Sequence, residues 1–185
     1  MTLDGTEISN ITGQLALGGA GITTIYVNSL TAAQTATLNG AIQIGVFGAG
    51  TVIFEGSTSV FSAGTGLFLA ASSANTLNAG ITVSSGDITL QSGTVTAADG
   101  VSLTAGGGSV TLGTATNASG AFTVNATGDI TINDNFISLG RLTITADSDA
   151  SGAGDLTLAS GVTITTNNNA LDIQAANIDN SSSTI

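Results

Sequence analysis

Residues 81–132 read ITVSSGDITL QSGTVTAADG VSLTAGGGSV TLGTATNASG AFTVNATGDI TI, and short apolar–polar–apolar triplets recur through them. Alternation of this kind is typical of a strand with one buried face. Gly-Asp-Ile-Thr occurs at residues 86–89 and again at 128–131, and the related Gly-Asp-Leu-Thr occurs at 154–157. Such self-similarity indicates a repeat architecture.

The apolar residues fall into three interleaved ladders with steps of about 20 residues. The first ladder contains Ile81/Val83, Val101/Leu103, Phe122/Val124, Leu142/Ile144 and Val162/Ile164. The second contains Ile88/Leu90, Val110/Leu112, Ile130/Ile132 and Leu171/Ile173, with Ala150 at the intervening rung, and the weaker third contains Val95, Ala115, Phe136 and Leu156. Three strands per period predict an all-β, three-sided parallel β-solenoid with one coil per about 20 residues, in which coils stack in parallel. An antiparallel β-sandwich is the alternative, but that fold gives no reason for the three ladders to share one register of about 20 residues.

The regularity is weaker toward the N-terminus. We interpret residues 1–50 as a less regular N-terminal part or cap of the solenoid, 51–176 as β-helix coils and 177–185 as a polar C-terminal tail that frays. Residues 29–38 predict either a short helix, with Ser29 as its N-cap and Gly40 just past its end, or an ordinary turn-rich coil. Further strands are expected at residues 14–17, 22–27, 41–47, 51–54 and 66–69.

Composition excludes several classes of function. The 185 residues include 12 acidic side chains but a single cation, Arg141, which gives a net charge of −11 and no basic surface for nucleic acid. With no His and no Cys, the chain lacks an imidazole base, a thiolate and His/Cys zinc ligands. No apolar run is long enough to span a membrane. We therefore expect no cofactor, no nucleic-acid partner and no membrane span.

Three motifs resemble a known repeat family. Gly-Asp-Ile-Thr-Leu at 86–90, Gly-Val-Ser-Leu-Thr-Ala at 100–105 and Gly-Arg-Leu-Thr-Ile-Thr-Ala at 140–146 are similar to the haemagglutinin-type repeats of large bacterial exoproteins. That group includes filamentous-haemagglutinin-like adhesins and autotransporter passengers, and the resemblance covers residues 80–175. It implies a right-handed parallel β-helix that forms a secreted or surface-displayed rod, often adhesive.

Outward positions of the first ladder form an expected flat array of small polar side chains. These are Ser102, Thr104, Thr123, Asn125, Thr143, Thr145, Thr163 and Thr165. One interpretation is a face that recognises ice or a crystalline polysaccharide. The alternative is that Thr simply suits exposed strand positions.

Carboxylates suggest two further kinds of site. Asp147, Asp149 and Asp155 lie in a Gly/Ser-rich stretch and could hold Ca²⁺, which prefers oxygen ligands, but the stretch lacks the known calcium-binding repeats and a solvated turn is the favoured alternative. Stacked Asp87, Asp129 and Asp155 could pair for glycoside hydrolysis, but each follows Gly at a strand start, which is a turn role. We therefore expect no enzyme.

The sequence thus predicts a non-enzymatic structural β-solenoid of the bacterial cell surface or extracellular space. It would act as a stiff rod or head-to-tail filament subunit, with adhesion to a glycan or host-surface receptor as an added role. Its partners would be copies of itself stacked end to end, or further coils of a longer chain. The competing function is a binding module that uses the Thr-rich face.

Overall fold

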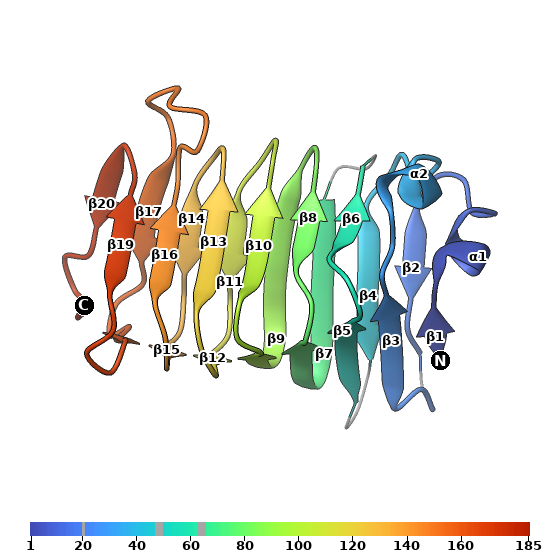
Figure 1. Ribbon diagram of the computed structural model, residues 1–185, viewed down its shortest axis with the longest axis horizontal. Coiled ribbons are helices and arrows are strands. Elements are labelled where there is room, and N and C mark those ends of the chain that lie inside the picture. Colours follow the sequence, from blue (N-terminus) through green and yellow to red (C-terminus); the bar gives the residue numbers. More distant parts are fainter. Residues whose placement is uncertain (20, 47–49, 63–65) are drawn as a thin grey trace.

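The computed structural model describes residues 1–19, 21–46, 50–62 and 66–185. It is a β-solenoid of about 8 turns with roughly 22 residues per coil, 50% strand and 5% helix. All pairings between its strands are parallel within the described ranges, and the chain winds in a right-handed sense along the long axis (Figure 1). The parallel solenoid predicted from the ladders is confirmed, and the β-sandwich alternative is wrong.

Each coil contributes to three faces, which we number from the view in Figure 1. Face 1, toward the viewer, is one sheet formed by β6 (Ser59–Phe61), β8 (Ile81–Val83), β10 (Val101–Ala105), β13 (Phe122–Ala126), β16 (Leu142–Thr145) and β19 (Leu171–Gln174). Face 2 contains β2 (Leu15–Leu17), β4 (Ile42–Val46), the first parts of β7 (Gly66–Leu77) and β9 (Asp87–Ala97), β11 (Val110–Leu112), β14 (Ile130–Ile132), β17 (Asp155–Leu158) and β20 (Asn177–Asp179). Face 3 contains β1 (Thr2–Leu3), β3 (Thr24–Asn28), β5 (Thr51–Glu55), the second parts of β7 and β9, β12 (Thr116–Ala118), β15 (Phe136–Ser138) and β18 (Ile164–Thr165).

Two short helices replace the strands of face 1 in the first two coils. Helix α1 (Gly5–Ile8) and helix α2 (Ala32–Thr35) lie at the N-terminal end, and α2 contacts β6. The predicted helix at 29–38 is confirmed, but it is shorter. Its N-cap is Thr31 rather than Ser29, because Thr31 and Gln34 form a reciprocal capping box.

The core is a continuous apolar column inside the coils. Inward residues of the ladders are buried, among them Ile88, Val110 and Ile130, which are all fully inaccessible and stacked in register on face 2. Across the core, the rings of Phe122 and Phe136 lie 5.5 Å apart at 59°. The predicted strands of the N-terminal region form β2, β3, β4, β5 and β7, although Phe47 of the 41–47 segment lies outside the described residues.

One loop shifts the register that the sequence suggested. Residues 147–154 project beyond the coil between β16 and β17 (Figure 1). After this loop, Leu142 pairs with Leu171 and Ile130 pairs with Leu156. The predicted rungs at Val162/Ile164 of the first ladder, Ala150 and Leu171/Ile173 of the second, and Leu156 of the third are therefore wrong.

Smaller shifts occur upstream and at the C-terminus. Ile81 pairs with Leu103 rather than Val101, and the third-ladder rung is Thr116 rather than Ala115. Residues 177–185, expected to fray, supply β20 and a bridge between Thr163 and Thr184. The last coil therefore includes the segment that composition suggested was a tail.

Candidate functional surfaces

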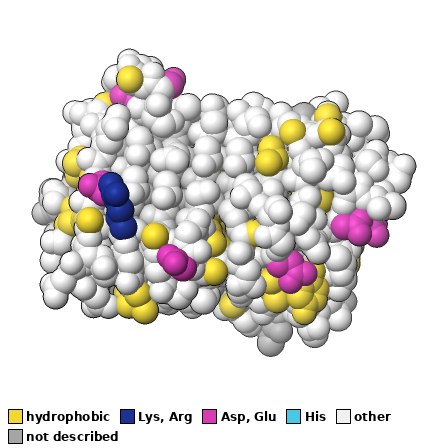
Figure 2. Space-filling view, viewed as in Figure 1, with side chains coloured by type: hydrophobic (Ala, Val, Ile, Leu, Met, Phe, Trp, Pro, Cys, Tyr) yellow, Lys and Arg dark blue, Asp and Glu magenta, His cyan; other side chains and the backbone are white. Residues whose placement is uncertain are grey.

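Six of the eight predicted array residues lie together on face 1. Ser102, Thr123 and Thr143 form one column, and Thr104, Asn125 and Thr145 form a second column beside it, all of them half-buried. Thr82 extends the second column toward the N-terminus. Figure 2 shows this side of the molecule, where most of the surface is neither charged nor apolar. The face can offer ordered hydroxyl groups and an amide to a ligand or to water.

The other two predicted residues lie elsewhere. Thr165 is on β18 of face 3, where it pairs with Ile137, and Thr163 immediately precedes that strand. Their expected places on face 1 are taken by Asp172 and Gln174. The guanidinium of Arg141 contacts the Asp172 carboxylate at 2.6 Å, so a charged pair ends the Thr-rich array (Figure 2).

Sequence reasoning missed a third Thr column, on face 2. Thr89, Thr111, Thr131 and Thr157 stack in register on four successive coils, each half-buried between two core positions. The signal was present in the repeated Gly-Asp-Ile-Thr motif. It was overlooked because the outward positions of only the first ladder were considered.

The acidic loop does not assemble three carboxylates. Asp147 accepts hydrogen bonds from the Ser151 hydroxyl at 2.9 Å and from the Gly152 amide at 3.0 Å, and Asp149 accepts one from the Ser151 amide. Burial raises the pKa of Asp147, but these hydrogen bonds outweigh it and hold the pKa below its ordinary value. In the described part of the chain, no three acidic side chains are grouped so that they could hold a metal ion.

Asp155 belongs instead to a ladder of side chains along one corner. The Ser109 backbone N–H donates to Asp87 Oδ1 at 2.8 Å, and the Asp129 backbone N–H donates to Ser109 Oγ at 3.1 Å. The Asp155 backbone N–H in turn donates to Asp129 Oδ1 at 2.9 Å. The side-chain Nδ2 of Asn177 then donates to Asp155 Oδ1 at 2.8 Å. Asp87, Ser109 and Asp129 each satisfy a backbone N–H of the next coil. Asp87, Asp129 and Asp155 therefore hold the corner together, as their position after Gly indicated.

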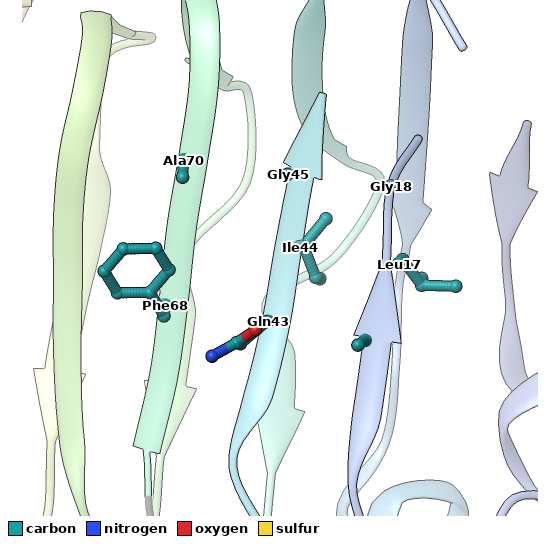
Figure 3. Close-up of a pocket in the computed structure, with 8 residues that line it drawn as sticks. Leu17, Gly18, Gln43, Ile44, Gly45, Phe68 and Ala70 are labelled. Atoms are coloured by element: carbon teal, nitrogen blue, oxygen red, sulfur yellow. The ribbon is translucent and has the colours of Figure 1, made fainter. Parts of the chain in front are cut away.

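A hollow lies on the N-terminal half of face 2 (Figure 3). It has a volume of about 270 Å³ and is lined by residues of β2, β4 and β7 and by Gly18. Gln43 and Phe68 are partners in adjacent strands and project beside each other, while Gly45 and Ala70 follow them along the same strands. Because the Gly45 and Ala70 positions carry at most a methyl group, the floor of the hollow is backbone.

A second, shallower hollow adjoins it on the other side of the same two side chains. It measures about 180 Å³, and Gln43, Phe68, Asp87 and Thr89 contribute to its lining. Gln43 and Phe68 thus form a ridge between an apolar hollow and one of mixed character, to which Asp87 and Thr89 add a carboxylate and a hydroxyl. Asp87 was singled out from the sequence as a corner residue, whereas Gln43 and Phe68 were not, because both precede the part of the chain in which the ladders were traced.

Comparison with known proteins gives no relative: no family model, curated protein or solved structure matches the chain. Within the described ranges, neither helix has the length and the apolar run needed to cross a bilayer.

Proposed function

We propose that this protein is a stiff structural β-solenoid that acts as a spacer or fibre subunit. The observation that carries the proposal is the unbroken stack of parallel strands on face 2, from β2 to β20, with the side-chain ladder along its corner. Hydrogen bonds that run continuously along one axis resist bending and stretching. The proposal includes the extracellular or cell-surface location, which composition favours through its hydroxyl-rich, acidic exterior.

The two ends of the rod differ, which bears on how copies could join. At the N-terminal end, β1 and β2 also have one strand partner each, but α1 occupies the place of a face 1 strand, and Leu3 and the helix residue Ile8 are buried. At the C-terminal end, β19 and β20 each have one strand partner, and Ile178 is 48% exposed, whereas the outer side of β18 is bridged by Thr184. Unpaired edges of this kind accept further strands. The open end is therefore the surface through which we propose that the rod continues, by a second copy or by further coils.

Electron microscopy and sedimentation of the purified chain test this function. Under the proposal, particles are rigid rods, and association grows with concentration through the open end. The substitution Ile178→Asp should reduce that association, because it places a charge on an apolar edge. The matched control is Ile137→Asp, on the side of face 3, where Ile137 is 40% exposed. Flexible particles contradict the rod, and monomers at every concentration contradict self-association.

The second candidate function is recognition of ice or a crystalline polysaccharide by the array on face 1. The two in-register columns, which run through Thr123 and Asn125, favour it. Replacing Thr123 and Thr143 by Tyr should abolish such binding and leave the rod intact. Thr163→Tyr, off this face, is the control. Equal ice-growth inhibition and polysaccharide retention by all three proteins would contradict this function.

A further inference from the structure

The two hollows on face 2 offer chemically different surroundings on either side of one ridge. The larger hollow contains Leu17, Gly18, Gly45 and Ala70, which supply no charge and no side-chain hydrogen-bonding group. The smaller hollow contains Asp87 and Thr89, whose side chains bring a carboxylate and a hydroxyl. Gln43 and Phe68 face both. An occupant that covers the ridge therefore meets apolar surface on one side and, on the other, apolar surface together with a carboxylate and a hydroxyl.

Gly45 is the residue that keeps the larger hollow open. It lies inside β4, and its backbone is outside the left-handed region that favours glycine. A Cβ at this position would lie 3.3 Å from the Ala70 carbonyl oxygen, a tight contact that a shift of a few tenths of an ångström relieves. Glycine inside a strand weakens the strand and often marks a place where a ligand approaches the backbone closely. The close Ala70 backbone gives one reason for glycine here, and a ligand that approaches the outer side of the strand would give a second.

We propose that this ridge and its two hollows bind two neighbouring neutral sugar units of a polysaccharide. A pyranose ring has one face of C–H groups and a rim of hydroxyl groups. The C–H face would pack on the Phe68 ring and the backbone floor, while the hydroxyl rim would exchange hydrogen bonds with Gln43, Asp87 and Thr89. The net charge of −11 and the nearby Asp87 carboxylate disfavour an acidic sugar. This site is on a different face from the Thr-rich array, and it does not depend on the rod function.

The size of the hollows fits two small rings rather than one large ligand. A dry cavity of about 150 Å³ holds a benzene ring, so hollows of about 270 and 180 Å³ each have room for one ring. Both are open and shallow, so we expect weak binding, with a dissociation constant of about 1 mM. A polysaccharide that presents many such units would gain by repeated contact.

The test is titration of the isotope-labelled protein with cellohexaose and, separately, maltohexaose, followed by NMR. Shifts should concentrate on Gly45, Phe68 and the Gln43 side-chain amide. Phe68→Ala should weaken binding at least about tenfold, because a large apolar contact is lost. Gly45→Val should abolish binding by filling the hollow. Thr157→Val, farther along face 2, should change nothing. Circular dichroism verifies that each variant folds, and Phe68→Tyr provides a ring-retaining variant that should still bind.

Other outcomes overturn the proposal. Cyclohexanol offers a ring without the hydroxyl rim, oligogalacturonate offers an acidic sugar, and a short Lys-rich peptide offers a cation for Asp87. Stronger binding of any of these than of both neutral oligosaccharides would assign the hollows to another ligand class. Sugar shifts confined to face 1, or no shifts with either oligosaccharide up to the limit of solubility, would also refute the site. Neither result would affect the microscopy that tests the rod.

Discussion

Replacement of Phe136 by Ala should destabilise the protein strongly. The Phe136 side chain is fully buried on β15, and its ring lies 5.5 Å from that of Phe122 on β13. Phe-to-Ala changes in protein cores cost about 3–5 kcal/mol through lost burial and the cavity left behind. The contact between the two rings, which joins face 3 to face 1 across the core, accounts for about 0.5–1.5 kcal/mol of this.

Urea unfolding followed by far-UV circular dichroism measures the loss, with Ile137→Ala as the matched control. Ile137 is the next residue on the same strand but points outward and is 40% exposed, so its truncation should cost only about 0.5 kcal/mol. A double-mutant cycle with Phe122→Leu isolates the ring contact. If Phe136→Ala costs no more than Ile137→Ala, the inward assignment of Phe136, and with it the three-sided core, is refuted.

Three further predictions concern glycine, pH and charge. Gly18→Ala should destabilise the protein by about 1–3 kcal/mol, because φ is +151° and the new Cβ would lie 2.0 Å from the Gly45 carbonyl oxygen. Gly19→Ala is the control and should cost less, because φ is +155° but no atom lies within 4 Å of the new Cβ. Equal urea midpoints for the two variants would contradict the steric argument. Hydrogen bonds from Ser151 and Gly152 hold the pKa of Asp147 low, so the stabilising contribution of this carboxylate is complete at neutral pH and is lost as the pH falls through its folded pKa. Asp147→Asn should therefore make the melting temperature fall less steeply as the pH is lowered. An unchanged slope would contradict a stabilising role for the Asp147 carboxylate. Arg141→Ala should cost less than about 1 kcal/mol, and less still in high salt, since both partners are exposed; a large, salt-independent loss of stability in urea would contradict a surface ion pair.

Much of the fold followed from local sequence pattern. The alternation at residues 88–90, 110–112 and 130–132 specifies one buried and one exposed side for each strand, and the near-constant spacing stacks these strands in one register. The role of Asp87, Asp129 and Asp155 at the corner also followed, because Gly-Asp at a strand start is a turn signal. Such features depend only on neighbouring residues and on the period of the repeat.

The candidate surfaces were less accessible to this reasoning. A two-column array on face 1 was predicted correctly through Thr145, but the projecting loop at 147–154 displaced Thr163 and Thr165 to another face. The spacing alone gave no sign of that loop, since residues 162–164 alternate as a strand should and simply belong to a different face. The Phe68 ridge was missed for a different reason: Phe68 pairs with Thr89 in the regular register, but the second ladder was traced only from Ile88 and its outward positions were not considered.

The sequence by itself determined the parallel stacking, the inward and outward alternation, and the lack of imidazole and thiol chemistry, since these depend on residue type and a short repeat. The tertiary structure decided which strand follows which on each face, where the coil is interrupted, and which outward side chains become neighbours. Those properties depend on how many residues each loop holds outside the coil. Loop length is nearly free in energy for a long surface excursion, so the apolar pattern does not fix it.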